Sequence, residues 1–230
     1  MSTILVKIGG SLLYNEELEI NFEVIDKFKE WFEQQNEYTS CVLVVGGGKL
    51  SRFITNQAKS KMEADYLRHR IGLKVTQVNA ALVHGLLGEK DSKYFEEISD
   101  ILNFLKNDRV KFSIIGGTRI GDSTDMTAAE IAVELGLNFV NKVSNIEYIY
   151  SDDPNLNDDA EPYERLSWDQ YIQLFEENFS KGHQPGMSIP VDFKSVSLSQ
   201  ENKLRFRICG GDNIHKQGFE EMLKGGTIVE

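Results

Sequence analysis

Three glycine-rich turns give this 230-residue chain its clearest capacity for chemistry. Each turn follows a short apolar run, and the three occupy residues 6–11 (VKIGGS), 44–49 (VVGGGK) and 114–119 (IIGGTR). Glycine has no Cβ, so the backbone amide of such a turn can approach an anion closely. A lysine or arginine beside each turn adds positive charge. Three turns of this kind predict a site that holds several phosphate groups.

Lys7 lies just before the first turn, Gly9 and Gly10. A lysine that points from a strand end at a glycine turn can neutralise a phosphoryl group during its transfer. The alternative is an edge lysine in solvent, and a short motif of this kind does not decide between the two.

Three successive glycines, Gly46, Gly47 and Gly48, form the second turn, and Lys49 and Arg52 follow it. A helix that begins here presents unbonded backbone amides and the positive end of its dipole to an anion. The alternative is a tight strand-to-helix turn with a solvated basic edge. Three glycines are more than a turn needs, so we favour a phosphate-binding turn.

The third turn continues through Thr118 to Ser123, Thr124 and Asp125. The threonine hydroxyls can donate hydrogen bonds to phosphate, and Ser123 or Thr124 can cap the helix that follows. Asp125 either sits in the first helical turn because the dipole favours it there, or orients a lysine beside the reacting phosphates. The sequence alone leaves both roles open.

The chain shows no zinc or calcium motif. Its four histidines are scattered, and the acidic stretch 152–159 lacks the central glycine of a calcium loop, so we interpret it as a solvated loop and predict no protein-held metal ion. Tyr150 could stack on a nucleobase, with a core tyrosine as the alternative. Cys41 and Cys209 lie in apolar runs and are expected to be buried, reduced thiols.

The overall charge argues against several classes of partner. A net charge of −11 and a pI near 4.9 oppose broad binding to nucleic acid or to an anionic membrane, because both need a positive surface. No run approaches the roughly 18 apolar residues of a membrane span. The N-terminus lacks the basic start and long apolar stretch of a signal peptide, so we expect a cytoplasmic protein.

The elements that must position these residues alternate between strands and helices. Continuous apolar runs predict buried strands, and apolar residues at helical spacing predict helices. This alternation favours a parallel sheet with helices on both faces. The predicted strands are 3–8, 41–45, 112–115, 138–143, 147–150, 204–209 and 227–229, and the predicted helices are 22–35, 50–60, 63–87, 125–135, 168–177 and 214–223.

Three segments carry a weaker signal. Residues 88–108 are mixed and polar, 151–163 are acidic and turn-forming, and 180–190 indicate a flexible loop. The long helix has an apolar face from Leu67 to Leu82, which fits an interface or an ordinary core equally well. No linker separates the two halves of the chain, so we expect them to share one sheet.

In their order along the chain, these motifs resemble those of the amino acid kinase superfamily, and within it the uridylate (UMP) kinases of the archaeal type. The matching segments are 7–11, 46–52, 116–118 with 123–125, 150–154 and 226–228. The resemblance covers nearly the whole chain, and the set of motifs is specific although no single one is. It implies an α/β fold, a three-layer αβα sandwich around a mostly parallel sheet. It also implies a single domain, 1–230, with an acceptor-binding lobe of about 1–140 and an ATP-binding lobe of about 141–230.

The resemblance further implies a kinase that uses ATP with Mg²⁺ and phosphorylates a phosphate monoester, first of all UMP. Lys7 would lie by the transferring phosphoryl group, with Asp125 orienting it. The residues implied for ATP are Lys7, Gly9, Gly10, Ser11, Asn145, Tyr150 and Asp153, and those implied for the acceptor are Gly46, Gly47, Gly48, Arg52, His69, Gly117, Thr118 and Thr124.

The chain departs from the family pattern at three places. His69 replaces an acid that holds the ribose hydroxyls, Glu147 and Tyr148 replace an Asp-Gly pair, and segment 185–192 keeps only a glycine and Asp192. The first departure motivates a second hypothesis, a kinase for another small phosphate (isopentenyl phosphate or an aminomethylfuran-methyl phosphate) or for a carboxylate. Tyr148 motivates a third, a non-catalytic nucleotide- or oxyanion-binding protein.

The family also forms hexamers built on dimers. The resemblance therefore implies a homo-oligomer whose other partners are small-molecule substrates. We expect neither nucleic acid nor a membrane among its partners.

Overall fold

An eight-stranded sheet runs through the computed structural model of this chain, in the strand order β3-β4-β2-β1-β5-β9-β10-β8. The structure describes residues 2–61, 64–108, 110–152, 154, 156–176, 189–210 and 212–230, with the backbone alone for 212–215 and 217. The strands of the sheet are β1 Thr3–Ile8, β2 Ser40–Val45, β3 Ser92–Phe95, β4 Phe112–Ile115, β5 Phe139–Ser144, β8 Arg165–Leu166, β9 Arg205–Gly210 and β10 Thr227–Val229.

The six strands from β3 to β9 are mutually parallel. Strand β10 runs antiparallel to β9, and β8 is parallel to β10. Parallel strands are buried on both faces, which explains why β2 is buried along its whole length and reads as one apolar run.

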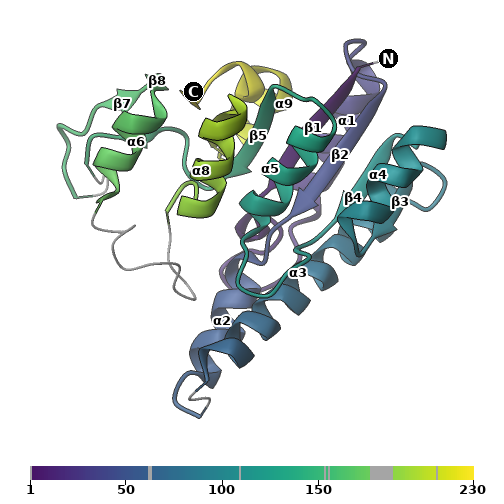
Figure 1. Ribbon diagram of the computed structural model, residues 1–230, viewed down its shortest axis with the longest axis horizontal. Coiled ribbons are helices and arrows are strands. Elements are labelled where there is room, and N and C mark those ends of the chain that lie inside the picture. The colour runs from purple at the N-terminus through teal and green to yellow at the C-terminus, as the bar shows by residue number, and fades with distance from the viewer. Residues whose placement is uncertain are drawn as a thin grey trace.

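Helices cover both faces of the sheet (Figure 1). One core joins side chains of β1, such as Val6, to α1 Phe22–Gln34, α3 Asp65–Leu87 and α9 Asp212–Lys224. The other core joins Leu5 and Val42 to α4 Ile98–Asn107, α5 Thr124–Glu134, α6 Trp168–Leu174 and α8 Phe193–Asn202. The predicted three-layer αβα sandwich is thereby confirmed.

Two parts of the fold lie outside the main sheet. Helix α2, Gly48–Ala58, and the first half of α3 project away from the strands (Figure 1). A separate two-stranded sheet is formed by β6 Ile149–Tyr150 and β7 Pro162–Tyr163, which pair antiparallel. The projecting helices and this small sheet both contribute residues to the site described below.

Most predicted elements agree with the structure to within one or two residues, and strand β1 matches at both ends. The prediction missed β3 and α4, which occupy the segment 88–108, and the short strands β7 and β8. It also missed α8, because the buried side of that helix is formed by Ser195, Val196 and Ser199, which give almost no apolar periodicity. The predicted strand 147–150 is shorter, with only Ile149 and Tyr150 paired. The predicted loop 180–190 lies mostly outside the described residues.

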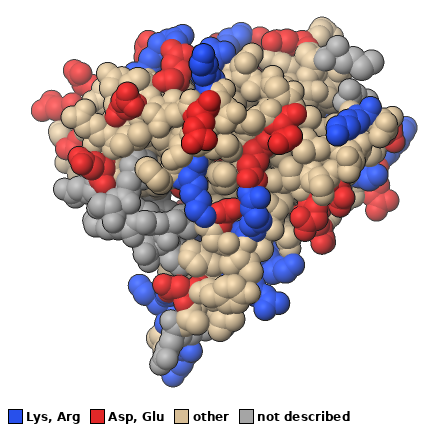
Figure 2. Space-filling view, in the orientation of Figure 1, with Lys and Arg blue, Asp and Glu red and all other residues tan. Residues whose placement is uncertain are grey.

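Both cysteines are free and buried, as predicted. Burial raises the pKa of both thiols, that of Cys209 to about 12, so they are neutral and unreactive at ordinary pH. No helix among the described residues combines the length and apolar character needed to cross a bilayer. Lys and Arg side chains are interspersed with Asp and Glu on the face shown in Figure 2.

Candidate active site

A cleft of about 900 Å³ opens at the carboxyl ends of the parallel strands. Lys7 lines it from the end of β1, Gly46 follows β2, Gly117 follows β4, and Ser144 ends β5. Strand β1 lies between β2 and β5, so the chain leaves in opposite directions on its two sides at this point. Such switch points are where open α/β sheets bind ligands. The three glycine turns of the sequence are thus brought to one place.

The first two glycine turns lie directly against each other. A Cβ atom on Gly10 would lie 2.2 Å from the carbonyl oxygen of Gly46, and one on Gly48 would lie 1.9 Å from the carbonyl carbon of Gly10. Gly48 also has a φ of 57°, which side-chain-bearing residues rarely adopt. The third turn approaches α3 as closely, because a Cβ on Gly116 would lie 2.8 Å from the Thr76 carbonyl oxygen. The glycines are therefore needed for backbone packing as well as for any ligand.

Several amides of these turns already have acceptors within the protein. Gly9 donates to the Val143 carbonyl (2.8 Å), Gly46 to the Ile8 carbonyl (2.9 Å) and Gly117 to the Thr76 hydroxyl (2.7 Å). Helix α2 begins at Gly48, and the first amides of a helix have no acceptor inside it. The start of α2 is consequently a place in the cleft where amides and the helix dipole favour an anion.

A buried set of three charges lies at the inner end of the cleft. Lys7 and Lys142 are register partners on the adjacent strands β1 and β5. Asp125, in the first turn of α5, bridges them: its Oδ1 lies 3.2 Å from Lys7 Nζ and its Oδ2 lies 2.6 Å from Lys142 Nζ. The side chains of Lys7, Asp125 and Lys142 are only 9%, 8% and 7% exposed. Two cations and one anion give this set of three side chains one net positive charge.

Burial and pairing act against each other on these groups. Burial disfavours the Asp125 carboxylate, but the charges of Lys142 and Lys7 outweigh burial and lower the pKa of Asp125 below its ordinary value. At Lys142, in contrast, burial dominates: together with the charge of Lys7 it lowers the lysine pKa to about 8, although Asp125 and Asp192 oppose the shift. Lys142 therefore titrates far closer to neutrality than an exposed lysine.

The start of α5 is fixed by its cap. The Ser123 hydroxyl accepts hydrogen bonds from the amides of Asp125 and Met126, both 3.0 Å, and donates to the Asp192 carboxylate. Ser123, not Thr124, is thus the helix cap. Asp125 lies in the first helical turn and also forms an ion pair with Lys7, a position compatible with both of the roles that the sequence left open.

The outer end of the cleft is formed by α2 and α3. Arg52 lines it from α2 and is exposed, and His69 and Gly72 line it from α3. Lys49 does not line the cleft, since its ammonium binds Glu16 at 2.6 Å. Arg68, which the sequence patterns did not single out, also lines this end and forms an ion pair with Asp65.

A different set of side chains forms the end of the cleft beside β5 and β6. Asn145, Tyr148 and Tyr150 line it together with the apolar side chains of Leu174 and Phe175. The rings of Tyr148 and Tyr150 are nearly perpendicular, with centroids 6.3 Å apart. Aromatic and apolar walls of this kind suit a planar nucleobase.

Nearly all of the predicted site residues are brought together in this cleft. Its lining includes Lys7, Gly9, Gly10, Ser11, Gly46, Gly47, Gly48, Arg52, His69, Gly117, Thr124, Asp125, Asn145 and Tyr150. Thr118 is half-buried and does not belong to this lining. Asp153 lies outside the described residues. Lys142 was missed because a lysine in the strand FVNKVS gives no sign of its role until the register of β1 with β5 is known.

The described part of the chain offers no group of three or more His, Cys, Asp or Glu that could hold a metal ion. Both oxygens of Asp125 already face lysines. The lysines at the inner end of the cleft therefore suit anionic oxygens.

Comparison with known proteins agrees with this geometry. The amino acid kinase family matches residues 2–210. The uridylate kinases of Thermococcus onnurineus and Archaeoglobus fulgidus are 30% and 27% identical to this chain, over 99% of the chain and 99% of the relative in the first case and 98% and 99% in the second.

The crystal structure of the Archaeoglobus fulgidus uridylate kinase superposes with a TM-score of 0.75 at 24% identity, covering 99% of both chains. That of the UMP kinase of Bacillus anthracis gives a TM-score of 0.76 at 16% identity, covering 99% of this chain and 95% of the other. The sequence match over 2–210 and the shared fold lead to one conclusion: the chain belongs to the amino acid kinase family.

Proposed function

We propose that this protein transfers the γ-phosphoryl group of ATP to UMP, giving UDP and ADP. The observation that carries the proposal is the buried Lys7–Asp125–Lys142 set at the centre of one continuous cleft, with an anion-binding helix start on one side and an aromatic-lined pocket on the other. Full-length similarity to proteins named uridylate kinase supports UMP as the acceptor.

The reaction asks for positioning and charge neutralisation. An oxygen of the UMP phosphate attacks the γ-phosphorus, the bond from that phosphorus to the β,γ-bridging oxygen breaks, and ADP leaves with the electron pair. The attacking phosphate is already ionised, so no general base is required. In such a loose transition state the negative charge spreads over the oxygens of the transferring group.

Lys7 and Lys142 supply two ammonium groups where this charge develops, in a site largely shielded from water. Asp125 takes no proton in this scheme. It keeps the two like-charged lysines together and aims them, through its 3.2 Å and 2.6 Å contacts. The residue is therefore required although it carries the same sign of charge as the substrates.

The two substrates enter from opposite ends. The acceptor phosphate binds at the start of α2 with Arg52, and the adenine of ATP lies by Tyr148 and Tyr150, beyond Asn145. This placement keeps the acceptor on the side of residues 1–140 and ATP on the side of residues 141–230. Mg²⁺ would be bound to the phosphates of ATP as part of that substrate and would neutralise part of their charge.

A coupled assay of ADP release with a panel of acceptors tests the proposal. We expect UMP to give the highest kcat/KM among nucleoside monophosphates and to exceed isopentenyl phosphate. ADP release with a non-nucleoside phosphate but not with UMP would show that UMP is not the acceptor. It would favour the second hypothesis, which His69 motivates. Calorimetric binding of ATP without release on any acceptor would favour a non-catalytic protein.

We further propose that the protein forms a dimer through α3 and works in the cytoplasm. Leu67 and Val78 are 42% and 58% exposed, and with Ile71 and Val75 they line an apolar groove of about 340 Å³ on one side of this helix. Exposed apolar patches of this kind mark interaction sites. Light scattering is expected to give at least twice the 26.1 kDa chain mass, and Val78→Asp is expected to lower it.

A further inference from the structure

A short backbone segment, 189–192, contacts the buried charged groups at the inner end of the cleft. Lys142 donates a hydrogen bond from its ammonium group to the Pro190 carbonyl, in addition to its contact with Asp125. Two residues later, Asp192 accepts hydrogen bonds from the hydroxyls of Ser123 and Ser195 and caps α8. The segment thus touches Lys142 directly and the start of α5 through Ser123.

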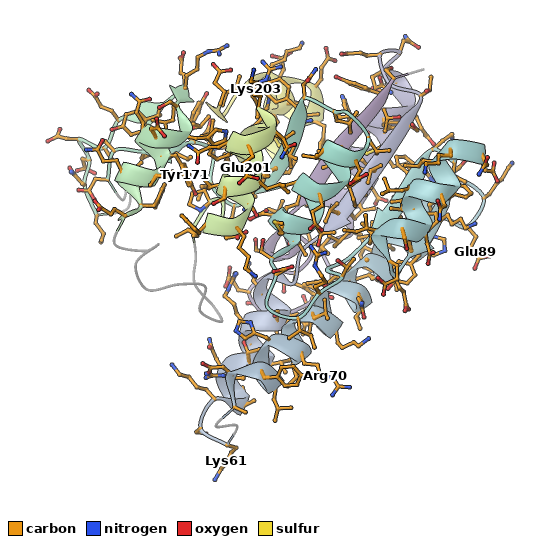
Figure 3. The ribbon with its side chains drawn as sticks, viewed as in Figure 1. Lys61, Arg70, Glu89, Tyr171, Glu201 and Lys203 are labelled. Atoms are coloured by element: carbon orange, nitrogen blue, oxygen red, sulfur yellow. The ribbon has the colours of Figure 1, made fainter. Side chains whose placement is uncertain are left out.

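Tyr171 holds this segment in place. Its hydroxyl donates to the Val191 carbonyl at 2.9 Å and accepts from the Val191 amide at 2.6 Å, so both polar groups of one residue bind one phenol. Figure 3 labels Tyr171 on α6, beside α8. The side chain is fully buried, with ring centroids 5.8 Å from Trp168 and 4.8 Å from Phe175. Its environment leaves the phenol little room to move.

Burial raises the pKa of Tyr171 well above its ordinary value, so the hydroxyl keeps its proton and can donate and accept at once. A phenylalanine at this position would preserve the ring packing. It would leave the amide and carbonyl of Val191 buried without their partner, which favours displacement of the segment.

We propose that Tyr171 is a positioning residue for the phosphoryl transfer: by fixing Val191 it holds the Pro190 carbonyl on the Lys142 ammonium. This role rests on the proposed function, because Lys142 is the group whose charge the reaction uses. The Tyr171 hydroxyl contacts the backbone of Val191 and not the reacting atoms, so Tyr171 is not a catalytic residue.

The charged groups that face Lys142 come from three other elements: Lys7 on β1, Asp125 on α5 and Asp192 before α8. The Pro190 carbonyl adds an uncharged acceptor that favours the protonated amine. Without the Pro190 carbonyl, burial and the repulsion from Lys7 act more strongly against the protonated form of Lys142. The pKa of Lys142, already about 8, then falls further.

The test compares the wild type with Tyr171→Phe, using Tyr163→Phe as the matched control. Tyr163 lies on β7, outside the cleft lining, and its hydroxyl has no part in this set. NMR titration of lysines labelled with ¹³C measures the pKa of Lys142 directly, with Lys142→Arg identifying the signal. We expect Tyr171→Phe to lower this pKa by about one unit, a tenfold loss of proton affinity, and Tyr163→Phe to leave it unchanged.

The activity profile gives a second readout. kcat/KM of Tyr171→Phe is expected to equal the wild type near pH 6 and to fall close to tenfold below it above pH 8, since the free enzyme's ionisation appears in kcat/KM. In a Lys142→Arg background this extra loss should vanish, because arginine does not titrate in that range. Any loss of thermal stability should remain in that background, which separates positioning from mere structure.

An unchanged Lys142 pKa in folded Tyr171→Phe would overturn the inference, as would an equal loss of activity at all pH values. The NMR titration needs no turnover. If the protein releases no ADP, the proposed function is wrong. The NMR titration would still show whether Tyr171 controls the pKa of Lys142, so the two claims are tested separately.

Discussion

The inner and outer ends of the cleft hold their charges in different ways. At the inner end Lys7, Asp125 and Lys142 are each less than a tenth exposed and stand on strand ends and a capped helix turn. At the outer end Arg52 is exposed on α2. Charges inside a protein interact strongly and are screened little, whereas exposed charges are weakened by water and salt. This difference fits the proposed function, in which the inner end performs the chemistry and the outer end captures the acceptor.

The largest effect is expected from removing the anion of the inner end. Asp125→Asn removes the carboxylate that bridges two buried ammonium groups and leaves Asp192 as the remaining counter-charge near Lys142, so kcat should fall on the order of a thousandfold. Asp100→Asn is the matched control, since Asp100 is an exposed acid in the first turn of α4 and should lose less than about twofold, as expected for an exposed charge. Steady-state ADP release measures both. A fall below tenfold for Asp125→Asn would remove this residue from the mechanism.

The next largest effect is expected from disturbing the close contact between the first two glycine turns. Gly48→Ala places a Cβ 1.9 Å from Gly10 and forces a side chain into a φ of 57°. We expect a loss of stability of about 1–3 kcal/mol from the backbone strain alone, and a loss of kcat/KM of about a hundredfold from displaced catalytic groups.

Gly85→Ala is the control for that substitution. Gly85 lies in α3, and a Cβ added there would meet nothing within 4 Å, so alanine should raise the free energy of unfolding by about 0.5–1 kcal/mol. Thermal unfolding with ADP release measures the pair. Equal behaviour of the two variants would contradict the close contact between the glycine turns.

The pH dependence of kcat/KM provides a smaller effect that tests the inner end of the cleft. In the proposed mechanism Lys142 must be charged to neutralise the phosphoryl group, and it loses its proton as the pH rises through its pKa of about 8. kcat/KM should therefore fall about tenfold per pH unit above that value in the wild type. In Lys142→Arg this limb should disappear below pH 10, because arginine stays protonated. A limb that stays in place in the arginine variant would assign it to another group.

The smallest effect is expected at the outer end. Arg52→Gln removes an exposed cation from the acceptor side, so KM for UMP should rise about tenfold at low salt while kcat changes little. The rise should shrink to about threefold at 0.5 M salt, since exposed charges are screened. Lys61→Gln is the control, because Lys61 is exposed at the tip of the projecting helices and lies outside the cleft lining (Figure 3). A rise in KM that does not change with salt would mean that Arg52 is shielded from solvent in the complex, as the buried lysines are.

Local patterns predicted a large part of this molecule. Strand β1, the helix that follows the second glycine turn and the burial of both cysteines depend on neighbours in the chain, so apolar runs and turn residues reveal them. The missed helix α8 shows the limit of such patterns. Its buried side chains are small and polar, and they are satisfied by contacts that form only in the fold, such as the Ser195 hydroxyl on Asp192 at 2.5 Å.

The sequence by itself determined that three glycine turns would end buried strands and that Lys7 and Asp125 could serve one anionic site. Only the tertiary structure decided which further side chains join them. Lys142 meets Lys7 because β5 pairs with β1 in one register, and Tyr171 reaches Lys142 through a backbone segment 20 residues further along the chain. The physical reason is that pairing register and long-range packing follow from the free energy of the whole fold, which no local stretch of residues encodes.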